Sequence, residues 1–316
     1  MIKLLTLLVL TCVTSLAAVD RPVVVASTTQ IADFARQIGG DAVEVICILQ
    51  PGADPHSYQP TTRDAELVLG ADLCLENGLH LEGSNWMATL AKDAGKRVVT
   101  CTDGVQLLRI KEDGEEVADP NAWFDPKQAA THVREDGEEV ADPHAWFDPK
   151  QAATYVRNIT AALCELVPDK AGAFQARAEL YRQQLRILDA WIKQQVAVIP
   201  AERRVLVTSH DAFNYFCQAY GFINRAPVGW STAELEGGVT PVSRQRVIDA
   251  IAKEGIPAVF VETSVSRELL TEIATEAGVA IGGTLYSDSM GTADSAGASY
   301  IGMMRENVLV IVEGLR

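Results

Sequence analysis

Short apolar runs alternate with amphipathic segments along most of the chain. Apolar runs at residues 22–26, 43–49, 73–76 and 97–102 predict strands, and periodic segments at 29–38, 61–69 and 86–92 predict helices between them. The same alternation resumes after residue 204, with expected strands at 205–209, 258–261 and 279–281 and expected helices at 212–219, 244–252, 268–276 and 298–313. Strands that alternate with helices form parallel βα units. The pattern therefore predicts the α/β class, with two parallel-sheet lobes.

A helical stretch separates the two βα regions. Asp148 followed by Pro149 is typical of a helix start, and that helix is expected to end before Pro168. A second helix is predicted from about residue 169 to 198, with apolar side chains at helical spacing: Phe174, Leu180, Leu185, Leu188, Trp191 and Ile192. At 1.5 Å per residue, about 30 residues span roughly 45 Å. We therefore expect an N-terminal lobe at 19–168, a rigid linker helix at 169–200 and a C-terminal lobe at 201–316.

The first 18 residues have the pattern of a secretory signal peptide. Lys3 precedes the apolar run at 4–10, and small residues at 15–18 offer a cleavage site. Cys12 raises lipoprotein anchoring as a less favoured alternative, because Thr11 is a poor residue before a lipidated cysteine. No later stretch is apolar over 18 residues, so we expect a periplasmic or otherwise extracytoplasmic protein.

Charge and cysteine content narrow the function classes. The chain carries 27 basic and 42 acidic residues, a net charge of −15, whereas a nucleic-acid binder needs a basic face. An acidic balance attracts cations but identifies no ligand. Five of the six cysteines remain when Cys12 is set aside, and no two have CxxC spacing. Because an odd number cannot all pair, we interpret them as buried thiols.

A tandem repeat interrupts the regular pattern. Residues 112–134 and 135–157 have the same sequence except at two places, where Asn121 corresponds to His144 and His132 corresponds to Tyr155. Two copies are too few for a solenoid. We therefore interpret the repeat as an insertion, either natural or engineered.

Three histidines and one aspartate stand in loops next to predicted strands or helices. His56 lies in PGADPHSYQP, and His144 lies in ADPHAWFDP just before a helix. His210 and Asp288 each follow a strand, in VLVTSHDAF and TLYSDSMG. Ligands of α/β proteins gather at the carboxyl ends of strands. Spacing alone does not separate these residues from histidines packed in a core, because the chain has no HExxH, CxxC, GxGxxG or P-loop motif.

Four motifs, in this order, resemble the zinc and manganese solute-binding proteins of ABC importers, the TroA-like family: PGADPHSYQPTTRD, DPHAWFDPKQA, VLVTSHDAFNYF and LYSDSMG. The similarity extends from about residue 22 to the C-terminus. It implies two α/β lobes joined by one long helix, with the metal in the cleft between them. It also implies that His56, His144, His210 and Asp288 are the metal ligands, two from each lobe.

The chemistry of this set agrees with the resemblance. Three neutral imidazoles and one carboxylate suit Zn²⁺ and can bind Mn²⁺, whereas Ca²⁺ and Mg²⁺ prefer oxygen ligands. Four protein ligands complete a tetrahedron, which favours capture over catalysis. We therefore expect a protein that is not an enzyme and that delivers Zn(II) or Mn(II) to the permease of an ABC importer. A metal-binding adhesin, a periplasmic metal chaperone and a secreted zinc hydrolase are the alternatives.

The repeat bears directly on this site. The family pattern has room for one DPHxWFDP segment, and only the second copy contains a histidine, His144. Three arrangements of the first copy are then open. It loops out of a monomer, it takes the place of the DPHxWFDP segment and leaves a site with three ligands, or it acts as a hinge for a domain-swapped homodimer. An extended segment of 23 residues reaches roughly 75 Å, so distance does not forbid a swap.

Three other residues have less definite expectations. Glu262 follows a strand and Asp211 adjoins His210, so each either orients a ligand or forms an ordinary ion pair. His80, in GLHLEG, is expected to lie in a loop or at the surface, away from the metal.

Overall fold

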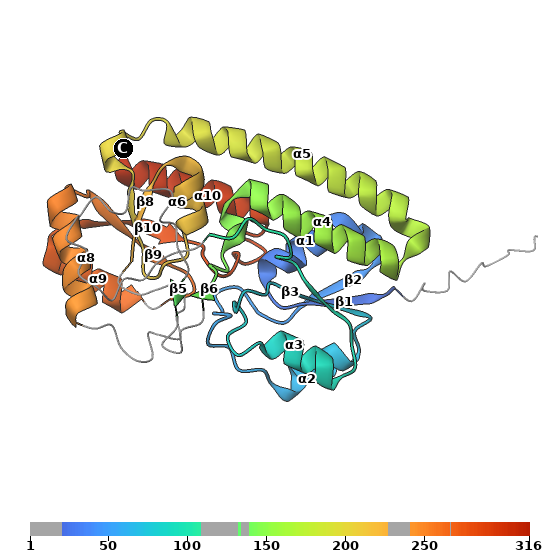
Figure 1. The fold of residues 1–316 in the computed structure, drawn as a ribbon. Helices are drawn as coiled ribbons and strands as arrows, with labels where there is room; N and C mark the ends of the chain where they lie inside the picture. Colours follow the sequence, from blue (N-terminus) through green and yellow to red (C-terminus); the bar gives the residue numbers. More distant parts are fainter. Residues whose placement is uncertain (1–20, 109–131, 134–138, 227–240, 266) are drawn as a thin grey trace, which may run out of the picture.

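The computed structural model describes residues 21–108, 132–133, 139–226, 241–265 and 267–316 (Figure 1). The predicted signal peptide and Cys12 lie outside these ranges, and so does most of the first repeat copy, including Asn121. Within the part of the chain that is described, no helix is long and apolar enough to cross a bilayer.

A four-stranded parallel sheet organises the N-terminal lobe. Its strands are β1 (Val23–Ala26), β2 (Glu44–Cys47), β3 (Leu73–Glu76) and β4 (Val98–Thr100), in the spatial order β2-β1-β3-β4. Successive strand residues point to opposite faces. Val24 therefore faces the core beneath α1 (Thr29–Gly39), while Val25 faces α2 (Thr62–Leu69) and α3 (Trp86–Asp93) on the other side.

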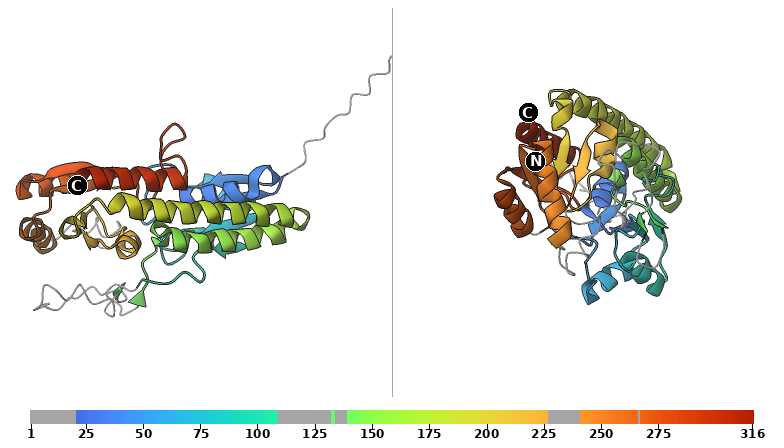
Figure 2. Two further views of the ribbon diagram at one scale, coloured as in Figure 1. Left: turned by 90° about the horizontal axis from the view of Figure 1, so that it is seen from above. Right: turned by 60° about the vertical axis from the view of Figure 1, so that its left-hand side comes forward.

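Two long helices lie in the middle of the chain, and the first begins within the second repeat copy. The helix α4 (Pro149–Leu166) begins as predicted, because the Asp148 carboxylate accepts the Lys150 N–H and Pro149 occupies the first turn. Next, α5 (Ala171–Val196) runs along one side of both lobes, packed against α4 and α10 (Figures 1 and 2). Its 26 residues span about 39 Å. Leu180, one of the apolar residues at helical spacing, is 58% exposed, because it lies on the solvent side of α5.

The C-terminal lobe contains two parallel strand pairs. One pair is β7 (Val205–Val207) with β8 (Ile223–Arg225), and the other is β9 (Ala258–Glu262) with β10 (Ala280–Leu285). Among the residues described for this lobe, the helices are α6 (Asn214–Tyr220), α8 (Pro241–Glu254), α9 (Arg267–Ala277) and α10 (Tyr300–Leu315). The sequence pattern did not predict β8, which has one apolar residue, Ile223. The α/β class with parallel sheets is confirmed.

Short elements complete the chain. Single 3₁₀ turns lie at Gly40–Ala42, Ala145–Phe147, Pro168–Lys170 and Ala201–Arg203. At the junction of the two repeat copies, β5 (His132–Val133) pairs antiparallel with β6 (Glu139–Val140).

The main hydrophobic core extends through both lobes. It includes Phe34 of α1, Phe174 of α5, Phe216 of α6, Leu285 of β10 and Ile311 of α10, all nearly inaccessible to solvent. The two lobes are therefore joined by continuous apolar packing along α5 and α10.

Candidate metal centre

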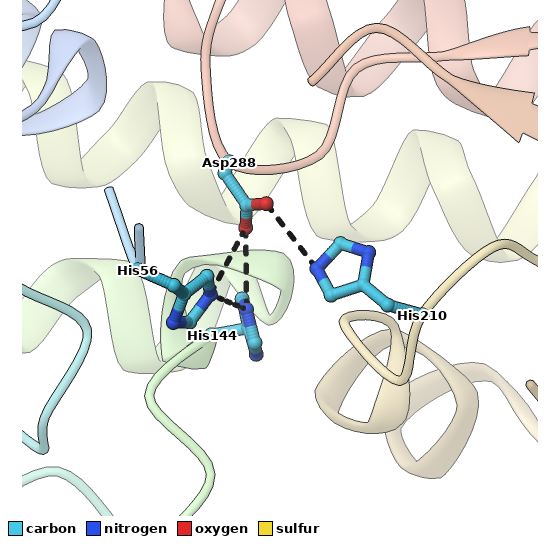
Figure 3. Close-up of side chains that lie close together, drawn as sticks. All are labelled: His56, His144, His210 and Asp288. Carbon is cyan, nitrogen blue, oxygen red and sulfur yellow. Dashed lines mark hydrogen bonds and ion pairs between the residues drawn. The ribbon is translucent and has the colours of Figure 1, made fainter. Parts of the chain in front are cut away.

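The structure brings together the four residues that the family resemblance implied as ligands. His56 lies in the loop after β2, His144 directly before the turn that leads into α4, His210 after β7 and Asp288 after β10. All four are buried, with exposures from 0% to 7%. One ligand atom from each lies within 4.8 Å of the others (Figure 3). Two come from each lobe, so the cluster lies where the lobes meet.

The spacing of these atoms suits a small tetrahedral ion. His144 Nε2 lies 3.3 Å from His56 Nε2 and 3.2 Å from Asp288 Oδ1. His210 Nε2 lies 3.2 Å from Asp288 Oδ2, and His56 Nε2 lies 3.8 Å from Asp288 Oδ1. With bonds of 2.0–2.1 Å, the ligand atoms of tetrahedral Zn²⁺ are about 3.4 Å apart. These four distances are therefore close to those of a zinc shell, and all four ligand atoms lie within 4.8 Å of one another.

Two buried atoms of the cluster have ion-pair contacts at 3.2 Å but no well-aligned hydrogen bond. Asp288 Oδ1 and His210 Nε2 are buried and make no hydrogen bond of acceptable geometry to the described residues. Leaving a buried polar atom unpaired costs free energy. An ion coordinated by these atoms would recover that cost.

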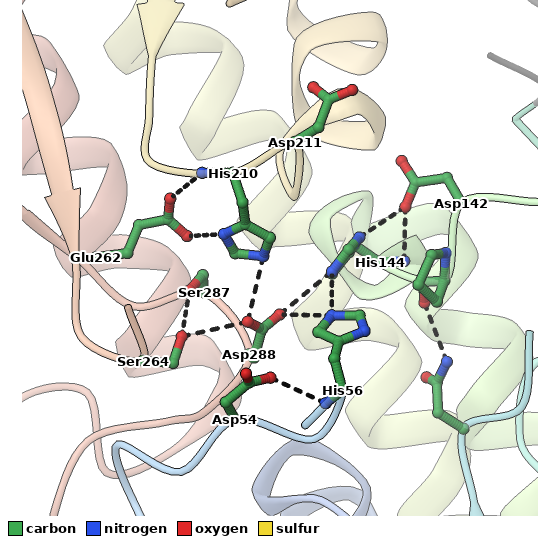
Figure 4. Close-up of polar contacts among 12 residues, drawn as sticks. Asp54, His56, Asp142, His144, His210, Asp211, Glu262, Ser264, Ser287 and Asp288 are labelled. Atoms are coloured by element: carbon green, nitrogen blue, oxygen red, sulfur yellow. Dashed lines mark hydrogen bonds and ion pairs between the residues drawn. The ribbon is translucent and has the colours of Figure 1, made fainter. Parts of the chain in front are cut away.

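Asp142 orients His144. Its Oδ1 lies 2.8 Å from His144 Nδ1 and accepts the His144 backbone N–H at 2.9 Å (Figure 4). Its other oxygen accepts from the Asn214 side chain, across the lobe boundary, at 3.2 Å. Burial opposes a charged imidazole, but the Asp142 and Asp288 carboxylates outweigh it and raise the pKa of His144 to about 9.

Sequence reasoning missed Asp142, although a signal was present. The tripeptide Asp-Pro-His occurs both at Asp54–His56 and at Asp142–His144. In both tripeptides the aspartate accepts the backbone N–H of the histidine two residues later, at 2.9 Å. Such local Asp-to-backbone bonds stabilise turns. Asp142 also lies within 2.8 Å of the imidazole ring of its histidine, at Nδ1.

Glu262 lies beside His210, at the end of β9. Its Oε2 is 2.8 Å from His210 Nδ1, and its Oε1 accepts the backbone N–H groups of Ser209 and His210 at 2.7 and 3.1 Å. Burial disfavours a charged imidazole, yet the Glu262 and Asp288 carboxylates raise the pKa of His210 well above its ordinary value. Glu262 is therefore placed to orient His210.

Asp211 and His80 lie apart from the cluster. The Asp211 side chain is directed away from the His210 ring (Figure 4), and its Oδ1 accepts a hydrogen bond from Asn224 Nδ2. Burial, and then the nearby Asp142 carboxylate, raise the pKa of Asp211 to about 7. His80 is exposed, with a backbone φ of 62°.

Burial and neighbouring charges together set the pKa values of His56 and Asp288. Removal from water lowers the pKa of His56 to about 4, so this imidazole is neutral and has a free electron pair. Burial would raise the pKa of Asp288, but His210 and His144 hold it well below its usual value. The cluster thus offers a permanent carboxylate and a neutral nitrogen to a divalent cation.

The second repeat copy supplies the site. His144 belongs to that copy, and Tyr155, the counterpart of His132, is buried and donates a hydrogen bond to Asn77 Oδ1 at 2.8 Å. Nothing in the described residues supports the homodimer hypothesis. Most of the first copy lies outside them.

Comparisons with known proteins agree on one family. The model of the family described as ZnuA, zinc-uptake complex component A, periplasmic, matches residues 24–314. The chain is 36% identical to the zinc-binding protein TroA of Treponema pallidum, over 95% of this chain and 90% of that protein. It is 36% identical to the manganese-binding lipoprotein MntA of Bacillus subtilis, with coverage of 93% and 89%. It is 34% identical to the iron-binding protein YfeA of Yersinia pestis, with coverage of 92% and 85%.

A solved structure supports the same assignment. The periplasmic zinc-binding protein TroA of Treponema pallidum superimposes with a TM-score of 0.79 and 34% identity, over 93% of this chain and 99% of that one. The resemblance deduced from the four sequence motifs is thereby confirmed. The chain therefore belongs to the ZnuA family of metal solute-binding proteins of ABC transporters.

Proposed function

We propose that this chain captures one Zn²⁺ or Mn²⁺ ion through His56, His144, His210 and Asp288 and delivers it to the permease of an ABC importer. The observation that carries the proposal is the convergence of four buried ligand atoms within 4.8 Å, from segments up to 232 residues apart (288 − 56). Burial without a partner would be costly for these groups. A bound divalent ion explains why they are gathered.

The donor set favours zinc in a simple binding measurement. Three nitrogens and one oxygen suit both metals, but an N/O site binds Zn²⁺ more tightly than Mn²⁺ by the Irving–Williams order. The relatives are named for zinc, manganese and iron, so their names do not select the transported metal. We infer that Zn²⁺ binds more tightly in vitro, whichever ion is imported in the cell.

The site is suited to capture and release. A hydrolytic zinc site keeps one coordination position for water, whereas four protein ligands leave none. We therefore infer that the chain is a binding protein and not a zinc hydrolase. Because each lobe supplies two ligands, a change in the separation of the lobes lowers the coordination number and frees the ion for a permease.

The protein is proposed to act outside the cytoplasm. The N-terminal pattern of a basic residue, an apolar run and small residues directs export. Several relatives, MntA among them, are named lipoproteins. Anchoring through a lipid on Cys12 therefore has more support than Thr11 alone suggests. Radiolabelled palmitate on the wild-type chain, and none on Cys12→Ser, would establish the anchor.

Metal titration with a matched pair of variants tests the proposed site. His144→Ala should lower Zn²⁺ affinity by more than the roughly 10–100-fold typical of groups that only orient a ligand. His132→Ala, in the first repeat copy, should leave the affinity near wild type. A competing chelator supplies the measurement, and native mass spectrometry should show one ion per chain. Equal losses in the two variants, or no bound ion in the wild type, would contradict the proposal.

A further inference from the structure

The turn that carries Asp288 is buried against the opposite lobe. Ser287, Asp288 and Ser289 are at most 1% exposed, and Met290 is 5% exposed. A buried turn must find partners for its backbone N–H and C=O groups, because no water reaches them. Two of these partners are side chains of the first turn of α1, in the N-terminal lobe.

Thr29 and Gln30 hold the turn on both sides of Asp288. The Met290 N–H donates to Thr29 Oγ1 at 2.8 Å, and the Gln30 Nε2 donates to the Ser287 carbonyl at 3.2 Å. The two side chains are themselves connected, because the Thr29 hydroxyl donates to Gln30 Oε1 at 3.1 Å. One continuous set of hydrogen bonds therefore runs from residue 290 through α1 to residue 287.

The C-terminal lobe holds the backbone at the two ends of the turn, where Tyr286 bonds to the Asn307 side chain and the Gly291 N–H donates to the Gly297 carbonyl, and it holds side chains within the turn. Ser264 Oγ lies 2.7 Å from Ser287 Oγ and donates to Asp288 Oδ2 at 3.2 Å. We call the Thr29 and Gln30 hydrogen bonds to this turn the clamp. A further bond from the N-terminal lobe, from the Gly52 N–H to Ser289 Oγ at 2.8 Å, reinforces it. The backbone groups on either side of Asp288, at residues 287 and 290, are thus bonded by side chains of the opposite lobe.

We propose that Thr29 and Gln30 are positioning residues that hold the Asp288 carboxylate at the metal from the opposite lobe. This inference rests on the proposed function, in which Asp288 is a ligand. When the lobes separate, the turn loses its clamp, so that loss of lobe contact and loss of the carboxylate ligand are coupled. The clamp therefore favours retention of the ion in the closed molecule.

Replacement of Thr29 tests the clamp with closely matched side chains. Thr29→Val keeps the shape but removes the hydroxyl, so the buried Met290 N–H and Gln30 Oε1 lose their partner. Thr29→Ser keeps the hydroxyl. We expect Thr29→Val to raise the Zn²⁺ dissociation constant and dissociation rate by about 10-fold or more, as for other groups that orient a ligand, and Thr29→Ser to restore both. Stopped-flow transfer of Zn²⁺ to a chelator gives the rate.

A double-mutant cycle separates positioning from general destabilisation. Once Asp288 is replaced by alanine, three histidines remain, and Thr29→Val should have no further effect on Zn²⁺ affinity. The visible spectrum of bound Co²⁺ should change in Thr29→Val and not in Thr29→Ser, because the geometry around the ion changes. A Thr29→Val protein that binds Zn²⁺ like the wild type, or one that weakens binding equally in the Asp288→Ala background, overturns the clamp. An Asp288→Ala variant with unchanged affinity would instead overturn the proposed metal site.

Discussion

At the scale of single residues, two identical tripeptides play unequal parts. In both Asp-Pro-His segments the aspartate shapes the turn by accepting a backbone N–H, and Asp142 also contacts the ring of His144 at Nδ1. When His144 Nε2 binds a metal, Nδ1 must carry the proton. A carboxylate at 2.8 Å holds that proton and makes the ligating nitrogen more basic.

The difference leads to a prediction for Asp142→Asn. The amide oxygen can still accept one N–H, but the negative charge near His144 is lost and the amide N–H₂ opposes the donor of Asn214. We expect Zn²⁺ affinity to fall by about 10–100-fold. Asp54→Asn is the matched control and should cost much less. Competition titration measures both, and a loss from Asp54→Asn as large as that from Asp142→Asn would show that the ring contact is unimportant.

Protons compete with the metal for the same nitrogens. An unperturbed histidine is neutral above about pH 6.5, but in the metal-free protein the pKa of His144 is raised to about 9. Because imidazolium cannot bind a metal, Zn²⁺ affinity should rise as pH increases toward 9 and fall steadily below it. Titrations between about pH 5.5 and 9 check the direction. An affinity that stays constant down to about pH 5 would contradict histidine ligation.

At the scale of helices and strands, periodicity predicted the elements best where one face is buried. The α4 start at Asp148 and Pro149 was predicted from local chemistry, and the structure shows the cap. The strand β8 was missed because only one of its three residues is apolar. It is a strand because it pairs in parallel with β7.

The four proposed ligands could be predicted from family motifs. The contacts of Asp142 and Glu262 with ligand rings depend on tertiary packing, which spacing does not encode.

Two leucines of α5 show what helical spacing leaves open. Both Leu180 and Leu188 fit the apolar pattern, yet Leu180 is 58% exposed and Leu188 is 3% exposed. Leu188→Ala should lower the free energy of unfolding by about 2–5 kcal/mol, because it leaves a cavity in the core. Leu180→Ala should change it by less than about 0.5 kcal/mol. Urea unfolding of the metal-free protein provides the comparison, and similar losses would mean that both leucines are buried in solution.

At the scale of the whole molecule, one core and one metal site join the same two lobes. The apolar core runs from Phe34 in α1 to Ile311 in α10, and the four ligand atoms meet beside it. Continuous packing of this kind predicts that the lobes unfold together. A ligand that contacts both lobes should therefore stabilise the entire molecule and not one half.

Thermal unfolding with and without metal tests this coupling. Binding to the folded state alone adds about 2.7 kcal/mol when the free ion is at 100 times its dissociation constant, so Zn²⁺ should raise the midpoint of a single transition. The shift should nearly vanish in His144→Ala, whose fold keeps the same core, and persist in His132→Ala. A second transition that ignores Zn²⁺ would show that one lobe unfolds independently. An equal shift in His144→Ala would place the stabilising ion away from the cluster, because a site that loses one of four ligands cannot bind as tightly as before.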